Sequence, residues 1–576
     1  MRMKKYLLLL SVLALGACAS QSGTYTLHLL TTNDVHGRWF DTDYTTGVCR
    51  NSLMAVNYYV DSIRKADGTG NVLLIDAGDC LQGDNASYYY NYVDTLSEHL
   101  FSRLVSYMKY DGITVGNHDV ETGHRVYDRV SRELHRHGIP FFGGNAIRND
   151  NGKPYFDVYK VYKRSGLKIL VLGYTNANNP AWMDESLWSG MHFESLVPLV
   201  QNDVDRYTAK TKPDVVIVTV HSATGDGNGR QLEAQGSDLY KSLKGVDFVV
   251  CSHDHREITF NNGSIALINT GNRAKFLGHG RLTLEKKNGR VVSKRVDSEL
   301  IPVDKKKSDP AMKEFFKEDF EAVKAFSHEE IGALAVDLRT KDAYSGMCNY
   351  VNLLHTVMLK GTGADVSFAA PLSFNSTIKS GILIYDDLFS IYPFENELYS
   401  MRLKGSEIKD YLEYSYSKWL NAPGSDHVLR IIMQDGPRNN QTGWSFVNRT
   451  YNFDSAAGIC YTVDINRPAG KRVNIISMAD GSAFDPGADY VVALTSYRAS
   501  GAGGLLTKGA GIPENELEGR IIRRYPEIRS FIYDFIKEFG LLDESAIYKP
   551  SRNGSWKFVP EKEAERRIGE DLSLVF

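Results

Sequence analysis

The feature that most constrains this chain is a series of short polar clusters, each placed directly after an apolar, mostly β-branched run. The runs have the length of buried strands in a parallel sheet and cover residues 27–32, 72–75, 113–115, 215–220 and 246–250. The clusters after them carry carboxylate, imidazole and amide groups: Asn33-Asp34-Val35-His36-Gly37, Asp76-Ala77-Gly78-Asp79, Gly116-Asn117-His118-Asp119, His221-Ser222 and His253-Asp254-His255. Open α/β sheets bind ligands beyond the carboxyl ends of their strands. We therefore expect these clusters to converge on one site.

Length and composition limit the class of protein. A chain of 576 residues exceeds one hydrophobic core and predicts two or three domains. With 42% apolar and 24% charged residues, the chain has the composition of a soluble globular protein. A formal net charge of −3 gives no sign of a polyanion-binding protein, so we expect no nucleic-acid polymer as a partner. A small anionic substrate remains compatible with this balance, and no obligate protein partner is predicted.

The amino terminus has the pattern of an export signal. Arg2, Lys4 and Lys5 precede an apolar stretch over 6–17, shorter than the roughly 20 residues of a membrane-spanning helix. The stretch ends in Leu15-Gly16-Ala17-Cys18, which resembles a bacterial lipobox. We expect residues 1–17 to be removed and Cys18 to carry the lipids, with an ordinary cleaved signal as the alternative. No acidic residue follows in 19–22, which favours attachment to the outer membrane facing the periplasm.

The remainder divides into two parts and a connecting segment. Strand runs alternate with helical segments such as 53–65 and 95–109 from residue 25 to about 305, which indicates layered α/β architecture. Around 305–310 the chain turns polar, and Asp309 with Pro310 has the pattern of a helix start. We expect a linker helix within 306–328, a second domain over 329–545 and a surface extension over 546–576.

The cysteines do not form a disulfide framework. Five remain after Cys18, an odd and scattered set without metal-type spacing. Cys80 and Cys251 lie beside the polar clusters, and we interpret both as small core residues.

The clusters suit a phosphoesterase with two metal ions. Two divalent ions about 3.5–4 Å apart acidify water and neutralise the transferring phosphoryl group. A carboxylate shared between them, with His, Asp and Asn completing each shell, suits zinc, manganese, iron or cobalt.

The motif series resembles that of the calcineurin-like metallophosphoesterases, and more closely that of the exported 5′-nucleotidase family. The resemblance covers residues from about 25 to 545 and rests on the clusters above, including Asp76-Ala77-Gly78-Asp79-Cys80-Leu81-Gln82-Gly83. It implies a four-layer αββα sandwich followed by a second α/β domain that binds the nucleotide, with a hinge at the linker helix. It also implies one metal held by Asp34, His36, Asp79 and His255, and another held by Asp79, Asn117, His221 and His253.

The resemblance further implies that His118 faces the substrate phosphate, where it stabilises the transition state or protonates the departing oxygen. The family pattern usually places an Asp three positions after this His. Here Glu121 stands at that position, so we expect Glu121 to orient the ring, with simple solvent exposure as the alternative. We interpret His28 and His279 as structural residues.

Recognition of the substrate is expected in the second domain. The resemblance points to Phe394 and Tyr497 as the two walls of a base-stacking site, with ordinary core packing as the alternative for each. Further candidate contacts of the substrate are Asn375, Arg498, Ser500 and the strand-end residue Asn145.

Details within the resemblance favour one branch. The arginine-containing glycine stretch of typical 5′-nucleotidases is replaced by Ala369-Ala370-Pro371-Leu372-Ser373-Phe374-Asn375, and the loop Tyr497-Arg498-Ala499-Ser500-Gly501 lacks the usual Asp. These segments, with Tyr451-Asn452-Phe453-Asp454, are more similar to the 2′,3′-cyclic-nucleotide 2′-phosphodiesterase/3′-nucleotidases. We favour that activity over 5′-nucleotide or nucleotide-sugar hydrolysis. More distant alternatives are a non-catalytic nucleotide-binding surface lipoprotein and a thiosulfate-type hydrolase.

Overall fold

The computed structural model describes residues 22–183, 185–394, 396–433 and 443–576. The chain forms two compact units that divide between Phe326 and Ser327. The expected signal peptide and Cys18 lie outside the described residues. Within the described part, no helix combines the length and apolarity needed to cross a membrane.

The first unit contains two mixed six-stranded sheets. One has the order β14-β13-β1-β2-β3-β4 and the other β11-β12-β10-β9-β7-β6. The predicted strand runs correspond to β1 (Gly23–Thr32), β2 (Val72–Asp76), β3 (Gly112–Thr114), β9 (Val215–Val220) and β10 (Phe248–Val250). The pairs β1–β2, β2–β3 and β9–β10 are parallel, so the strands end in the same direction within each sheet. The remaining strands are β4 (Phe141–Phe142), β6 (Tyr159–Arg164), β7 (Leu167–Tyr174), β11 (Glu257–Asn261), β12 (Ala266–Thr270), β13 (Phe276–Lys287) and β14 (Arg290–Pro302).

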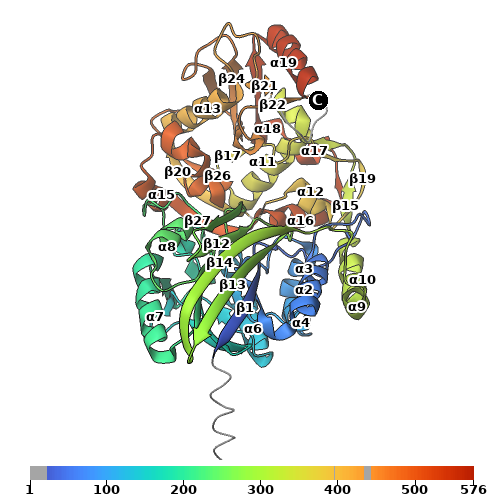
Figure 1. The fold of residues 1–576 in the computed structure, drawn as a ribbon. Coiled ribbons are helices and arrows are strands. Elements are labelled where there is room, and N and C mark those ends of the chain that lie inside the picture. Colours follow the sequence, from blue (N-terminus) through green and yellow to red (C-terminus); the bar gives the residue numbers. More distant parts are fainter. Residues whose placement is uncertain (1–21, 184, 395, 434–442) are drawn as a thin grey trace, which may run out of the picture. The chain divides into compact units, whose positions relative to one another are not determined.

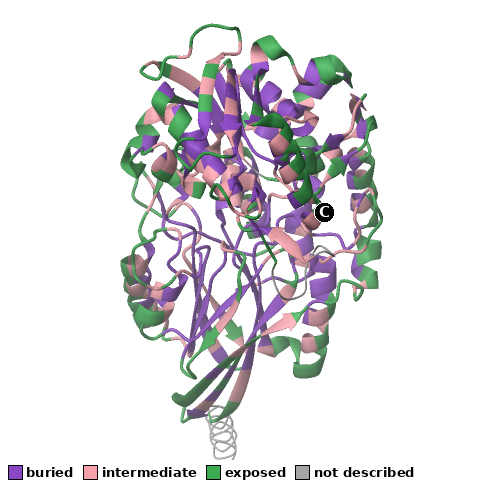
Figure 2. Ribbon diagram, turned by 90° about the horizontal axis from the view of Figure 1, so that it is seen from above, coloured by how far each residue is buried: buried purple, intermediate pink, exposed green. Residues whose placement is uncertain are grey.

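Helices cover the outer faces of both sheets (Figure 1). The first sheet packs against α2 (Leu53–Asp67), α4 (Leu100–Tyr107) and α6 (His124–Arg136). The second packs against α7 (Leu196–Thr211) and α8 (Gly236–Ser242). A separate apolar cluster fills the space between the sheets and includes Leu29, Ile75, Val171, Ile217 and Val250. The inner strands of both sheets are accordingly buried, while the edge strand β14 and the outer helix faces are largely exposed (Figure 2). This arrangement is the predicted four-layer αββα sandwich.

The segment predicted as a linker helix forms two helices, α9 (Pro310–Phe315) and α10 (Lys317–Ser327). Asp309 caps α9, because its carboxylate accepts hydrogen bonds from the backbone N–H groups of Ala311 and Met312. Met312, Phe316 and Val323 are buried in the core of the first unit, so both helices pack on that unit.

The second unit is built around a five-stranded sheet of order β23-β17-β26-β20-β27. These strands are β17 (Val366–Ala369), β20 (Glu397–Lys404), β23 (Ser455–Ala457), β26 (Asp489–Thr495) and β27 (Ile521–Glu527). Their main helical neighbours are α11 (Asn349–Thr362), α13 (Gly405–Trp419) and α16 (Ile528–Phe539).

The last thirty residues contribute to the core of the second unit. Strand β29 (Gly554–Val559) pairs in parallel with β24 (Ile459–Asp464), and α19 (Glu561–Val575) follows it. Trp556 and Phe558 are buried among the aromatic side chains of the unit. The segment differs from the predicted surface extension because its apolar residues alternate along a strand and face inward.

Candidate metal centre and aromatic pocket

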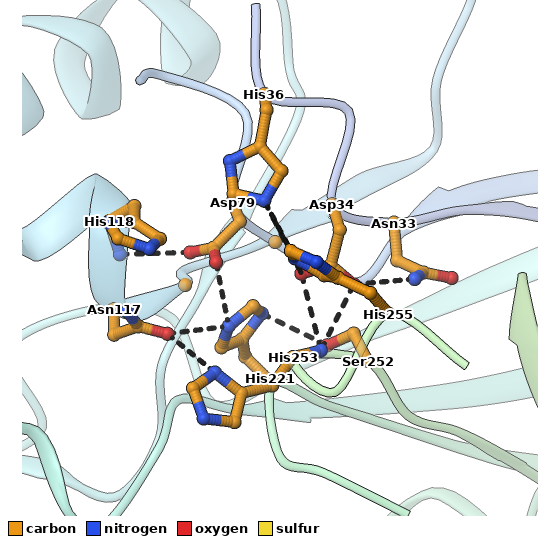
Figure 3. Close-up of polar contacts among 12 residues, drawn as sticks. Asn33, Asp34, His36, Asp79, Asn117, His118, His221, Ser252, His253 and His255 are labelled. Atoms are coloured by element: carbon orange, nitrogen blue, oxygen red, sulfur yellow. Dashed lines mark hydrogen bonds and ion pairs between the residues drawn. The ribbon is translucent and has the colours of Figure 1, made fainter. Parts of the chain in front are cut away.

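The predicted strand-end clusters meet at one edge of the first unit (Figure 3). Asp34 and His36 follow β1, Asp79 follows β2, and Asn117 opens the short helix after β3. From the second sheet, His221 follows β9, while His253 and His255 follow β10. Side chains separated by more than 200 residues thus share one site because the two sheets face each other.

The backbone at this edge is held in an unusual conformation. Five of the converging residues have positive φ angles between 48° and 73°: Asp34, His36, Asp79, His253 and His255. Non-glycine residues adopt this left-handed region at an energetic cost and are enriched at functional sites. Two backbone hydrogen bonds fasten the strained loops, from Asp34 N–H to Gly78 O at 2.9 Å and from His36 N–H to Asp79 O at 2.9 Å.

Two glycines make the close approach of these loops possible. A Cβ on Gly78 would lie 2.7 Å from His221 Nδ1, and one on Gly116 would lie 2.1 Å from Asp79 Oδ1. Such distances exclude any larger residue without movement of the site.

The side chains form two groups of potential metal ligands. Asp34, His36 and His255 make one group, and Asp79, His221 and His253 the other; within each, the ligand atoms lie within 4.8 Å of one another. In the first, His36 Nε2 lies 3.0 Å from His255 Nε2. In the second, His221 Nε2 lies 3.2 Å from Asp79 Oδ2. Asn117 Oδ1 lies 2.9 Å from both His221 Nε2 and His253 Nδ1.

The electrostatics of these groups fit cation binding. Burial lowers the pKa of His36 and of His253 to about 3, so both rings are neutral near pH 7 and carry a lone pair for a metal. Burial also raises the pKa of Asp34 to about 8. Burial opposes a charge on His221, but the adjacent Asp79 carboxylate raises its pKa to about 9. The donor set thus fits divalent cations, because added positive charge would compensate the buried carboxylates.

Surrounding groups fix the orientation of the candidate ligands. Asn33 Nδ2 donates to Asp34 Oδ2 at 2.6 Å. His221 Nδ1 lies 2.9 Å from the carbonyl oxygen of Ala77 and 3.0 Å from Ser252 Oγ. Orienting contacts of this kind set the ring tautomer and are a regular part of metal sites.

Asp119 organises the loops although the sequence analysis gave it no role. Its buried carboxylate accepts hydrogen bonds from four backbone N–H groups, those of Asp79, Cys80, Leu81 and Gly116. It thereby connects the loop after β2 to the start of the helix after β3. Its position two residues after Asn117, in the first turn of that helix, is the signal that could have identified it.

His118 lies at the same edge with a carboxylate beside it. Its Nδ1 is 2.6 Å from Glu121 Oε2 and 2.7 Å from Gln82 Oε1. The rings of His118 and His36 meet edge to face, with centroids 5.4 Å apart. Glu121 is therefore close enough to orient the His118 ring, as its position in the sequence suggested.

Trp182 is a further neighbour that the sequence analysis missed. Its ring stacks on that of His253, with centroids 4.9 Å apart and an interplanar angle of 26°. It lies in the segment after β7, whose run 167–174 also ends in polar residues, Thr175 and Asn176. The polar residues at the end of this strand run could have indicated that the segment with Trp182 lies near the site.

Asn145, a predicted substrate contact, is hydrogen-bonded within the first unit. Its side chain is fully buried; Oδ1 accepts from Thr175 N–H, and Nδ2 donates to Glu194 O. These two hydrogen bonds connect the neighbouring loops. His28 and His279 also contact each other, with stacked rings 5.2 Å apart, and Cys80 and Cys251 are buried free cysteines.

The second unit contains a small pocket with aromatic walls. A cavity of about 210 Å³ is lined by Phe394, Tyr451 and Tyr497 together with Phe368, Ala369, Ala370, Leu372, Asn396, Asp454, Thr495 and Arg498. Tyr451 meets Phe394 and Tyr497 edge to face, with centroids 5.8 and 6.3 Å apart. Phe394 and Tyr497 remain 38% and 39% exposed, so both present ring surface to a ligand.

The other predicted contacts have different surroundings. Arg498 is buried, and its guanidinium donates to both carboxylate oxygens of Asp454 and to Asn452 Oδ1. Because these hydrogen bonds occupy its guanidinium, Arg498 supports the wall of the pocket. Ser500 is exposed and donates to Tyr497 O. Asn375 is exposed on the loop after β17 and does not line the cavity.

Comparisons with known proteins agree with this architecture. Residues 330–508 match the family model of the 5′-nucleotidase C-terminal domain, and residues 56–268 match that of the bacterial capsule synthesis protein PGA_cap. The trifunctional nucleotide phosphoesterase YfkN of Bacillus subtilis is 22% identical over 94% of this chain, which spans 40% of that protein. The 2′,3′-cyclic-nucleotide 2′-phosphodiesterase/3′-nucleotidase of Haemophilus influenzae is 22% identical, with 96% of this chain and 90% of that protein covered.

A solved structure has the same fold. A Staphylococcus aureus protein described as a 5′-nucleotidase superposes with a TM-score of 0.72 at 21% identity, covering 92% of this chain and 99% of that one.

Proposed function

The chain belongs to the 5′-nucleotidase family of phosphoric-ester hydrolases, and from this premise we propose that it removes phosphate from nucleotides outside the cytoplasm with two bound divalent metals. The observation that carries the proposal is the pair of ligand groups at the strand ends of the first unit. Family membership confirms the predicted resemblance.

We assign the first metal to Asp34, His36, Asp79 and His255, and the second to Asp79, Asn117, His221 and His253. Asp79 would be the ligand shared by both, and its carboxylate lies between the His36 and His221 rings (Figure 3). When bound, the two ions supply an activated water and neutralise charge on the phosphoryl oxygens. Asn33 and Ser252 keep the Asp34 carboxylate and the His221 ring in their binding orientations.

His118 handles charge or a proton at the leaving oxygen. Glu121 accepts from His118 Nδ1–H, which holds the ring proton on that nitrogen and stabilises the imidazolium form. A protonated His118 stabilises the developing negative charge or donates its Nε2 proton to the departing oxygen. Glu121 acts through His118 and is a positioning residue.

The aromatic pocket of the second unit holds the base. Stacking on aromatic rings contributes about 1–3 kcal/mol per base and tolerates different bases. Phe394 and Tyr497 offer the exposed rings, while Tyr451 closes the space between them. Among the residues that line the cavity, the single cationic side chain, Arg498, is bound to Asp454. This pocket therefore recognises the uncharged nucleoside part.

Within the family we favour 2′,3′-cyclic-nucleotide 2′-phosphodiesterase and 3′-nucleotidase activity. Support comes from the segment 369–375, which lacks the arginine of typical 5′-nucleotidases. A relative with that named activity, covered over 90% of its length, adds support. The alternative is 5′-nucleotide or nucleotide-sugar hydrolysis by the same metals.

A substrate panel separates these activities. The manganese-supplemented protein is assayed on 2′,3′-cyclic AMP, 3′-AMP and 5′-AMP. Hydrolysis of the first two supports the favoured branch, whereas turnover of 5′-AMP alone contradicts it. Chelator-insensitive nucleotide binding without any turnover would contradict the enzymatic proposal itself.

The export signal completes the proposal. We propose that the chain is cleaved before Cys18 and carries lipids on that cysteine, which would anchor the protein to a membrane. Mass spectrometry of the mature amino-terminal peptide tests this, because an unmodified cysteine or a different first residue contradicts it.

A further inference from the structure

The end of the first unit opposite the candidate metal centre carries an excess of basic side chains. The parallel strands run away from this end, so the segments that enter β2, β3, β9 and β10 lie here, together with the β6–β7 and β13–β14 turns. The exposed basic residues of these segments include Lys65, Lys109, Lys163, Lys212, Lys244 and Arg290. Among the described residues, none of the six forms an ion pair. We call this surface the basic end.

Three carboxylates at the basic end pair with Lys or Arg, while the exposed Asp67 lies 3.8 Å from His28 Nε2. Lys286 Nζ lies 2.6 Å from Asp214 Oδ2, and Lys294 Nζ lies 2.8 Å from Asp247 Oδ1. Asp111 pairs with Arg164 beside a hollow of about 690 Å³ whose rim includes Lys109 and Lys163. The basic end therefore has more basic than acidic exposed side chains, although the whole chain has a formal charge of −3.

The chain enters the first unit at this same end. Strand β1 begins at Gly23 opposite Lys286 of β13. Ser22 Oγ accepts a hydrogen bond of 2.9 Å from the N–H of Asn288 in the β13–β14 turn. Figure 1 shows β1 and the β13–β14 hairpin reaching this end together.

The distance to the proposed anchor is short. Cys18 precedes Ser22 by four residues, and four residues span at most about 14 Å when fully extended. The charges of the basic end therefore come close to any bilayer that holds lipids attached to Cys18. Charged groups interact across about 8 Å at physiological ionic strength.

We propose that the basic end is a docking surface for the anionic headgroups of the membrane that holds the lipid anchor. The inference rests on the proposed anchor at Cys18. Docking would orient the first unit with its parallel strands pointing outward, so that the metal centre faces away from the bilayer. The lipids on Cys18 would hold the chain at the bilayer, and basic side chains close to anionic headgroups would add electrostatic attraction to that anchor.

Vesicle binding by the mature chain, residues 18–576 with Cys18→Ser in place of the lipid-carrying cysteine, tests the surface directly. Vesicles of phosphatidylglycerol with phosphatidylcholine are compared with phosphatidylcholine alone. We expect binding to the anionic vesicles only, and its loss at about 1 M salt, where the screening length falls to about 3 Å. Equal binding to both vesicles, or binding that salt does not weaken, would overturn the proposal.

A charge-reversal variant locates the surface. Each basic side chain near an anionic membrane strengthens binding about fivefold. The triple variant Lys109→Glu, Lys163→Glu and Lys212→Glu should therefore bind at least about 100-fold more weakly, because each change removes a positive charge and adds a negative one. The matched control reverses three exposed lysines outside the basic end, Lys306, Lys409 and Lys562. An equal loss in the control variant would show nonspecific attraction and overturn the proposal.

Two further measurements distinguish a failure of the docking proposal from a failure of the proposed nucleotide hydrolysis. Nucleotide hydrolysis in solution should be equal in the wild type and the triple variant, so a loss of vesicle binding with full activity concerns this surface alone. An inactive wild type that binds vesicles as expected would contradict the proposed function and leave the surface intact. Duplex DNA that binds the basic end more tightly than anionic vesicles do would identify a nucleic-acid surface instead.

Discussion

The strand-end cluster of the first unit and the aromatic pocket of the second are built in opposite ways. The cluster is polar and largely buried, with five residues in the left-handed backbone region. The pocket is mostly apolar, and its two main aromatic walls are more than one-third exposed. The cluster holds charged side chains in fixed positions, while the pocket offers aromatic surface on which a flat base can stack.

This difference matches two separate tasks, phosphate hydrolysis in the first unit and base recognition in the second. Charge stabilisation during phosphate hydrolysis needs ligands fixed in advance, and the strand ends with their orienting hydrogen bonds provide them. Base recognition gains from area and tolerates variation. Loss of one ligand should therefore damage the first region far more than loss of one ring damages the second.

The largest effect is expected at the shared ligand. Asp79→Asn keeps the shape of the side chain but removes the charge between the two ligand groups. Metal content should fall, and turnover should drop by more than about 10³-fold. Metal analysis and a nucleotide assay measure both, with the partly buried Asp128→Asn as the control. Wild-type metal content together with wild-type turnover in Asp79→Asn would contradict the assignment of Asp79 as the shared ligand.

The next effect is expected at His118. His118→Asn should leave the metals bound and slow turnover about 10²–10⁴-fold, because it removes the group that handles the leaving oxygen. His124→Asn is a matched control, since His124 bonds with Asp128 and Ser189 rather than with the cluster. Loss of metal from His118→Asn would instead place this ring among the ligands.

The pocket should respond more mildly. Phe394→Ala and Tyr497→Ala should each weaken nucleotide binding by about 1–3 kcal/mol, measured as an increase in KM. Hydrolysis of bis(p-nitrophenyl) phosphate, which has no base, should change little. Phe539→Ala, another ring of similar exposure in the second unit, serves as the control. Equal losses on both substrates would show that the two aromatic residues support the fold rather than the base.

The last effect concerns stability rather than activity, at a buried imidazole of α11. His355 contacts Ser367 Oγ and Ser455 Oγ, and burial lowers its pKa from 6.5 to about 3. Between these values the unfolded chain binds a proton that the folded unit does not. The free energy of unfolding should therefore decrease as the pH falls below about 6.5, by up to about 1.4 kcal/mol per pH unit.

Denaturant unfolding between pH 4 and 7 checks this contribution. His355→Gln should flatten the decrease, while the exposed His135→Gln should not. An unchanged slope in His355→Gln would show that the ring does not control acid stability. His355 in the second unit and His36 in the first are both neutral because they are buried. Of the two, only His36 lies among other potential metal ligands.

Sequence reasoning succeeded where function and strand pattern coincide. The apolar runs predicted β1, β2, β3, β9 and β10 closely, because buried parallel strands consist of continuous apolar residues. The endings of those strands predicted which side chains would meet. The four-layer fold followed from the alternation of strands and helices together with the family resemblance.

The remainder depended on information that a linear sequence does not display. The four backbone hydrogen bonds to Asp119 and the stacking of Trp182 on His253 arise only after distant loops meet. Arg498 has the chemistry of a ligand contact, but its pairing with Asp454 shows only in three dimensions. The apolar alternation in 554–559 was visible, yet its polar surroundings concealed a core strand.

Metal stoichiometry tests the central claim most directly. The stripped protein is loaded with manganese, the ions per chain are counted, and the paramagnetic resonance spectrum is recorded. The account predicts two ions per chain with a spectrum of coupled ions, because Asp79 would hold both at about 3.5–4 Å. A single ion with the spectrum of an isolated centre in a fully active protein would contradict it.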